Sequence, residues 1–248
     1  MTIGLKKGFR VAGAALLFSS LWWYGTATGP SLLVNGGFEE WNGSVPAGWQ
    51  MSAWRLSGSD FSAGPDIRQP HEGKVSLRID NKVPNDTLCI QHVPIQEGHV
   101  YRVSAWVKTL NVQAGQGSIG ACLCVGSTWI RSTSLVGTRD WAPVEFYVKT
   151  GKDVDRLPVA CRLGYWSSTV TGTAWFDQVS VDEVIPPFDN LSPMFTYGII
   201  NPAIPTSRAR WIRMISFGLL ILIISRLILV ASGTLPFLPW SRKRHRKK

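Results

Sequence analysis

The stretch Val100-Tyr-Arg-Val-Ser-Ala-Trp-Val-Lys-Thr109 shows most clearly which kind of fold the chain adopts. Apolar residues recur there at every second position, which is the period of a β-strand with one buried face. One face consists of Tyr101, Val103, Ala105 and Val107, and the other of Arg102, Ser104, Trp106 and Lys108. The stretch therefore predicts a strand whose first face packs in a core and whose second face is available for binding.

The same alternation returns in six further segments, which are residues 75–79, 88–95, 118–125, 144–149, 159–166 and 173–184. Gly, Pro, Asn and Asp gather between them, as expected for turns. No long stretch of this region has the 3.6-residue period of an amphipathic helix. Many short strands separated by turns predict an all-β fold, either a β-sandwich or a barrel.

Charge is distributed unevenly along the chain. The formal net charge is +10, yet all 16 acidic residues lie within residues 31–207, where 13 Lys and Arg leave a net charge of −3. The other basic residues flank two apolar runs near the ends of the chain. A domain that binds nucleic acid carries the positive field itself, so we expect no nucleic-acid partner.

The first apolar run, residues 11–24, follows Lys6, Lys7 and Arg10 and precedes the small residues Gly25-Thr-Ala27. A basic start, a short apolar core and a small-residue site are the parts of a secretory signal. As a helix the run would span only about 21 Å of a roughly 30 Å hydrocarbon core. Residues 1–27 are expected to be a signal peptide, with an uncleaved N-terminal anchor as the alternative.

The second apolar run, residues 214–232, is close to the length that spans a bilayer. Trp211 and Trp240 bracket it at interfacial positions, and six of the last seven residues are Lys or Arg. The run predicts a transmembrane helix over residues 211–235, with the basic tail 241–248 in the cytoplasm and the β-rich domain exported from the cell membrane. Five prolines in residues 185–207 predict an extended stalk between domain and helix.

Arg226 lies inside the expected transmembrane helix. A charge there costs about 2.5–3.5 kcal/mol on insertion scales. One interpretation is that its side chain reaches the cytoplasmic headgroups. The other is that it pairs with a carboxylate of another membrane protein, because neither apolar run of this chain contains an acid.

An ordered set of motifs resembles carbohydrate-binding modules of the family 4, 9 and 22 type. The motifs are Leu33-Val-Asn-Gly-Gly-Phe-Glu-Glu40, Pro46-Ala-Gly-Trp49, His71-Glu-Gly-Lys-Val-Ser-Leu77, Gln91-His-Val-Pro-Ile95, Gly98-His-Val-Tyr-Arg-Val-Ser-Ala-Trp-Val-Lys108, Gly137-Thr-Arg-Asp-Trp141 and Thr173-Ala-Trp-Phe-Asp-Gln-Val-Ser-Val181. The resemblance covers residues 31–184. It implies a jelly-roll β-sandwich of the galactose-binding-like type, a fold that hosts many functions.

The resemblance also implies a structural calcium ion near the opening and closing strands. The matching positions are Glu39 and Asp177, completed by backbone oxygens, because calcium takes six to eight oxygen ligands. Gln178 stands where many members of the family have a second Asp, which weakens the match. The alternative is that the two carboxylates cap turns without a metal.

A sugar-binding sheet needs exposed aromatic rings surrounded by polar side chains. The alternation predicts Trp106, Tyr147, Arg162 and Trp166 on the outer faces, with Gln91 nearby and Trp54 and Trp129 in loops. For Arg162, a surface ion pair with Glu145 is the alternative. The resemblance places Trp49, Trp141 and Trp175 at positions that usually pack in the core.

The acids lie mostly in turns, and no nucleophile motif or second domain remains, so we expect no enzyme activity. The favoured function is a non-catalytic, membrane-anchored protein that contacts polysaccharide of the envelope or outside the cell. The alternative is an accessory subunit of a membrane complex that uses the sandwich for protein contacts.

Overall fold

The computed structural model describes residues 27, 29–115, 117–166, 168–184, 194–198, 224, 225 and 228. Residues 24–200 form one compact unit, and the remaining residues form another, in which Ile224, Ser225 and Ile228 are helical. Within the described residues, no helix has both the length and the apolar character needed to cross a bilayer. Arg226, the tail 241–248 and nearly all of the expected signal and transmembrane segments lie outside the described residues.

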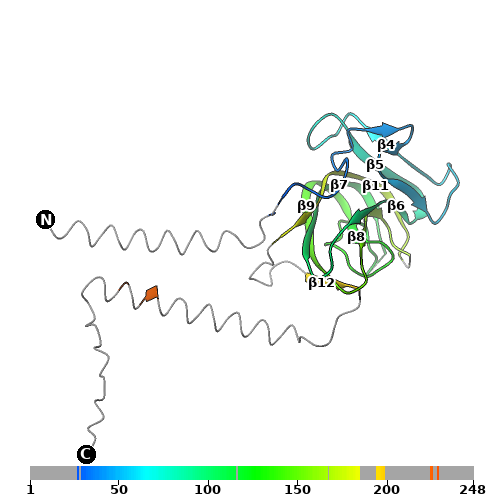
Figure 1. The fold of residues 1–248 in the computed structure, drawn as a ribbon. Coiled ribbons are helices and arrows are strands. Elements are labelled where there is room, and N and C mark those ends of the chain that lie inside the picture. The colour runs from blue at the N-terminus through cyan, green and yellow to red at the C-terminus, as the bar shows by residue number, and fades with distance from the viewer. Residues whose placement is uncertain are drawn as a thin grey trace, which may run out of the picture. The chain divides into compact units, whose positions relative to one another are not determined.

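The β-structure of residues 24–200 consists of short and long strands. They are β1 (Trp41–Asn42), β2 (Val45–Pro46), β3 (Gln50–Ala53), β4 (Phe61–Asp66), β5 (Ser76–Asn85), β6 (Thr87–Pro94), β7 (Val100–Gln113), β8 (Ala121–Val125), β9 (Gly137–Thr150), β10 (Arg156–Leu163), β11 (Val170–Glu183) and β12 (Met194–Tyr197). Figure 1 shows their arrangement. Each of the seven segments predicted from alternation overlaps one of these strands.

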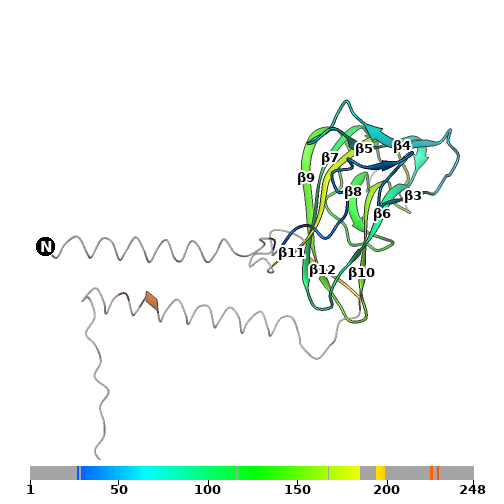
Figure 2. The same ribbon diagram turned by 45° about the horizontal axis from the view of Figure 1, so that its top comes forward.

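Two sheets form a sandwich. The six-stranded sheet has the order β12-β9-β7-β11-β5-β4, and the four-stranded sheet has the order β3-β6-β10-β8, while β1 and β2 form a small hairpin. Figure 2 shows the strands of the two sheets in separate layers. The prediction of an all-β sandwich is confirmed for the described residues of the unit 24–200.

The main core lies between the sheets and contains residues from both. On β7, the face predicted to be buried contributes Tyr101, Val103, Ala105 and Val107, as expected. On β8, Leu123 and its alternating neighbours face the same core. Trp49 also packs there, but Trp175 is buried outside this cluster and Trp141 is only half-buried.

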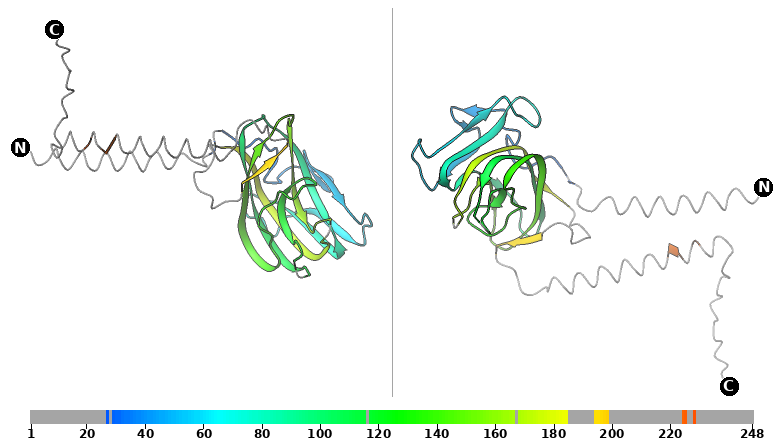
Figure 3. Two further views of the ribbon diagram at one scale, coloured as in Figure 1. Left: turned by 90° about the horizontal axis from the view of Figure 1, so that it is seen from below. Right: turned by 180° about the vertical axis from the view of Figure 1, so that it is seen from behind.

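The segment expected to be an extended stalk contains a strand. β12 pairs in parallel with β9, placing Met194 beside Tyr147 and Tyr197 beside Thr150. Figure 3 shows this short yellow-orange arrow at the sheet. Prolines bound the strand but do not occur within it, and Phe195 packs against the core. The prediction of a continuous stalk over residues 185–207 is therefore wrong at residues 194–197.

All four cysteines are buried free thiols, and burial raises the pKa of each. Cys89 on β6 and Cys161 on β10 are directly opposed and face the main core. Cys122 and Cys124 face away from that core in a smaller cluster with Tyr165.

Candidate functional site

Three aromatic rings lie together beside the four-stranded sheet and form what we call the aromatic platform: Trp129, Tyr165 and Trp166. The ring centroids of Trp129 and Trp166 are 5.1 Å apart, and each lies 5.7 Å from that of Tyr165. Trp129 is 61% exposed and Trp166 50% exposed, whereas Tyr165 is fully buried. The platform therefore presents two accessible indoles on a buried aromatic base.

Two turns bring these rings together. Trp166 lies in the turn after β10, where the backbones of Tyr165 and Ser168 exchange hydrogen bonds of 2.9 and 2.8 Å. Trp129 lies in the turn after β8, where the Thr128 hydroxyl donates to the Val125 carbonyl and accepts from the Ile130 N–H. The Tyr165 hydroxyl donates to the Thr128 carbonyl and so joins the two turns.

Arg162 supports the platform from within the sheet. The guanidinium donates Nε to Asp86 Oδ1 at 2.7 Å and Nη2 to Asp86 Oδ2 at 2.5 Å, a bidentate pair. It also donates Nη1 to the Gly126 carbonyl at 3.3 Å, and its Cζ lies 4.0 Å from the Tyr165 ring centroid. Burial acts to lower the pKa of Arg162, but Asp86 outweighs it and raises the pKa, so the cation is retained.

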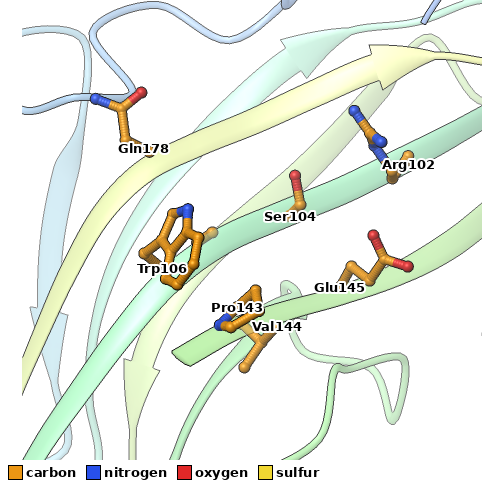
Figure 4. Close-up of a pocket in the computed structure, with 8 residues that line it drawn as sticks. Arg102, Ser104, Trp106, Pro143, Val144, Glu145 and Gln178 are labelled. Carbon is orange, nitrogen blue, oxygen red and sulfur yellow. The ribbon is translucent and has the colours of Figure 1, made fainter. Parts of the chain in front are cut away.

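Trp106 lies on the opposite side of the sandwich, on the outer face of β7. The His71 ring stacks on it at a centroid distance of 4.1 Å and an interplanar angle of 15°, and Trp141 meets His71 edge-on. Beside Trp106 is a cavity of about 430 Å³ lined by Arg102, Ser104, Ala105, Trp106, Pro143, Val144, Glu145 and Gln178. Figure 4 shows the polar side chains of this set on one side of the sheet. Tyr147 is buried beside this face with Val100 and Val184.

Gln91 points into the sandwich. It follows the inward alternation of β6, and only 7% of it is exposed. Its Oε1 accepts the Val34 N–H at 2.8 Å and its Nε2 donates to the Val34 carbonyl at 2.9 Å. Gln91 therefore ties the N-terminal segment of the domain to β6, and both ends of its amide are occupied by backbone.

Glu39 and Asp177 both hold the loop of residues 71–75. Asp177 accepts backbone N–H groups of His71 at 2.8 Å, Glu72 at 3.1 Å and Gln178 at 2.7 Å. Glu39 Oε1 accepts the backbone N–H groups of Lys74 at 2.8 Å and Val75 at 3.3 Å. Burial raises the pKa of Asp177 although the N–H groups oppose that shift.

The arrangement of these carboxylates bears on the calcium ion that the resemblance implies. Calcium needs six to eight converging oxygens, whereas Glu39 and Asp177 direct carboxylate oxygens at N–H donors. Across the part of the chain that the structure describes, no three His, Cys, Asp or Glu residues are placed to hold a metal. The described contacts fit turn-capping carboxylates, and the calcium ion stays a prediction of the resemblance.

The structure does not bring the five predicted ligand residues together. Arg162 belongs to the four-stranded sheet and Trp166 to the turn after β10 of that sheet. Trp106 and Tyr147 lie on the outer face of the six-stranded sheet, and Gln91 lies in the interior. Arg162 pairs with Asp86 rather than with Glu145. The sequence analysis missed Tyr165 and Asp86, although the consecutive aromatics Tyr165-Trp166 at the end of a predicted strand were a usable signal.

The comparisons with known proteins concern the same region. A family model described as a carbohydrate binding domain, CBM_4_9, matches residues 30–169. No curated protein matches the chain. Solved structures similar to it, at low identity, include three carbohydrate-binding modules. TmCBM61 in complex with β-1,4-galactotriose is 16% identical, over 62% of this chain and 99% of that one, with a TM-score of 0.45.

The CBM22-1 xylan-binding domain of Paenibacillus barcinonensis Xyn10C is 14% identical, over 64% of this chain and 97% of that one, with a TM-score of 0.43. A structure described as "CBM4 structure and function" is 19% identical, over 60% of this chain and 97% of that one, with a TM-score of 0.42. Because the family model spans more than half of the 248 residues, the chain belongs to the carbohydrate binding domain family CBM_4_9.

Proposed function

We propose that the chain is a non-catalytic polysaccharide-binding protein, exported and anchored in the membrane, and that the aromatic platform is its binding surface. The observation that carries the proposal is the pair of accessible indoles, Trp129 and Trp166, fixed side by side over Tyr165. Family membership independently supports carbohydrate as the ligand class. The sequence pattern of charge and apolar runs supports the membrane anchor.

The platform suits a sugar for physical reasons. A pyranose ring has apolar C–H faces, and these pack on indole faces while its hydroxyls stay hydrated or meet polar groups. Rigid rings lose little conformational entropy on binding. Here the ion pair of Arg162 with Asp86 and the Tyr165 hydroxyl hold the rings before any ligand arrives.

The proposal is tested by affinity gel electrophoresis of the full chain through gels that contain soluble xylan, β-glucan or galactan. The wild-type chain should be retarded by at least one polysaccharide. Trp129→Ala and Trp166→Ala should each weaken that binding by about tenfold or more, because a buried indole contact contributes more than about 1.4 kcal/mol. Both residues are exposed, so thermal unfolding should change little.

Leu110→Ala is the control variant. Leu110 is 44% exposed and lies on β7, in the other sheet, so its truncation should leave retardation unchanged. If neither Trp variant weakened a binding that the wild-type chain shows, the platform would not be the binding surface. Absence of polysaccharide binding together with a stable co-purifying membrane protein would favour the accessory-subunit function instead.

A further inference from the structure

The cavity on the outer face of the six-stranded sheet, which we call the sheet cavity, is separate from the aromatic platform. Its lining comes from β7, β9 and β11, whereas the platform lies at the ends of β8 and β10 in the other sheet. The inward-facing residues of β7 and the rest of the main core lie between the sheet cavity and the platform. A ligand in the sheet cavity would touch neither Trp129 nor Trp166.

A bulge in β11 shapes one wall of this cavity. The pairing of β11 with β7 shifts register between Asp177 and Ser180, and Gln178 adopts a positive φ of 50°. Bulges redirect side chains out of the regular alternation, and here Gln178 lines the same cavity as Trp106 (Figure 4). Asp177 helps to fix this bulge by accepting the Gln178 N–H at 2.7 Å.

The polar side chains of the cavity surround an apolar patch. Trp106 and Pro143 supply the patch, and Arg102, Glu145 and Ser104 lie next to it on the same face of the sheet. Figure 4 shows Arg102 and Glu145 on neighbouring strands with Ser104 between them and the indole. Donors and acceptors beside one ring are the combination that recognises a polyhydroxylated ring.

Two buried polar atoms at this site have no hydrogen-bond partner among the described residues, Nε of Arg102 and Nδ1 of His71. Arg102 lines the cavity and His71 stacks on Trp106. Buried polar atoms are nearly always paired, and an unpaired one indicates a missing partner such as water or a ligand. These two atoms therefore give the neighbourhood of Trp106 hydrogen-bonding groups that a polar ligand could use.

The charges of the cavity discriminate between ligand classes. Arg102 Nη2 donates to Asp182 Oδ2 at 2.8 Å, so its charge is already matched. Glu145 is the other charged residue of the cavity lining and carries a carboxyl group. The lining therefore offers an anionic sugar no cation that is still unmatched, whereas a neutral sugar can donate its hydroxyls to carboxylate oxygens.

We propose that the sheet cavity is a second carbohydrate site, which takes a neutral pyranose and lets one domain hold two polysaccharide segments on opposite sides of the sandwich. The ring packs on Trp106 and Pro143, and its hydroxyls reach Glu145, Gln178 and the Arg102 guanidinium. Two sites on one anchored domain raise the avidity for a multivalent polymer without any new contact. The proposal extends the platform proposal and does not depend on it, since neither Trp129 nor Trp166 takes part.

Titration calorimetry of the full chain with short neutral xylo-, gluco- and galacto-oligosaccharides tests this proposal. The wild-type chain should bind two molecules of the preferred oligosaccharide per chain. Glu145→Gln and Trp106→Leu should each reduce this to one, and so should the double variant Trp129→Ala/Trp166→Ala. Lys108 lies on the same face of β7 but outside the cavity lining, so Lys108→Gln should still bind two molecules of oligosaccharide per chain.

The outcomes separate the two proposals. If the wild-type chain binds one molecule and the Trp129/Trp166 variant binds none, the second site is refuted and the platform stands. If Glu145→Gln abolishes all binding and the platform variants change nothing, the platform is refuted and the sheet cavity stands. Thermal unfolding and circular dichroism of Glu145→Gln show whether its fold is intact, and Glu145 can be exchanged conservatively because Gln keeps its volume.

Discussion

At the scale of single residues, the ion pair between Arg162 and Asp86 connects the interior to the aromatic platform. Both side chains are almost fully buried, and the guanidinium contacts Asp86, the Gly126 carbonyl and the Tyr165 ring. The two charges compensate each other in a place that water does not reach. The pair therefore couples the stability of the sheet to the position of the turn that bears Trp129.

Replacing Arg162 with Met should lower the free energy of unfolding by about 3–5 kcal/mol, because it leaves the Asp86 carboxylate buried without its cation. Urea unfolding followed by tryptophan fluorescence measures the change. Arg156→Met, at the exposed start of the same strand, is the control and should stay within about 0.5 kcal/mol of wild type. Equal losses in the two variants would mean that the buried pair has no special part in stability.

Asp66 links stability to pH. Burial acts to raise the pKa of its carboxyl group, but hydrogen bonds from Trp175 Nε1 and the Arg68 N–H, with the charges of Arg68 and Arg78, lower the pKa overall. A lowered folded-state pKa stabilises the fold above the unfolded value of about 3.9. That contribution is lost as the pH falls through the folded-state pKa.

Asp66→Asn should therefore destabilise the protein more at about pH 7 than at about pH 2.5. Urea unfolding of both proteins at the two pH values gives the difference directly. Asp155 is exposed, so Asp155→Asn serves as the control and should change the free energy of unfolding little at either pH. A penalty for Asp66→Asn that grew on acidification would contradict the assigned direction of the pKa shift.

At the scale of elements, β12 is one of the strands that the alternation pattern missed, together with β1 to β4. Its residues form only four ladder positions with β9, and Phe195 contacts Phe146 edge-on at a centroid distance of 6.1 Å. The Gly151 N–H donates to the Tyr197 carbonyl at 2.7 Å. This strand covers the edge of β9, which would otherwise present unpaired backbone groups.

Phe195→Ala should lower the free energy of unfolding by about 1–3 kcal/mol, less than for a fully buried Phe, because Phe195 is half-buried. Met194→Ala is the matched neighbour, 42% exposed, and should have almost no effect. Hydrogen exchange of the β9 amides gives a second measurement, with faster exchange expected in Phe195→Ala alone. Similar results for both variants would show that β12 contributes no side-chain packing.

At the scale of the whole molecule, the proposed topology separates an acidic β-domain from a basic tail. Trypsin added outside intact cells should leave residues 242–248 uncut, since the positive-inside rule places them in the cytoplasm. An antibody against the tail detects cleavage, and detergent-permeabilised cells provide the control in which the tail is cut. Loss of the tail from intact cells would reverse the orientation and remove the proposed role at the cell surface.

The local sequence pattern alone determined the all-β class, the seven strands β5 to β11 and the inward face of β7. Strand period and turn residues are short-range properties, which is why the pattern reveals them. It could not tell Trp106 from Trp166, since alternation separates inside from outside but not one sheet from the other. Sheet membership follows from long-range pairing, which put β10 between β6 and β8 and β7 between β9 and β11.

The tertiary structure also decided which outward residues are accessible. Arg162 and Tyr165 lie on the outer side of the four-stranded sheet, yet the turn at residues 126–130 supplies one hydrogen-bond partner to each and both are buried. Trp166, the next residue after Tyr165, stays half exposed in the turn that follows β10. Burial depends on what packs over a position, and the packing element comes from a distant part of the chain that no local pattern specifies.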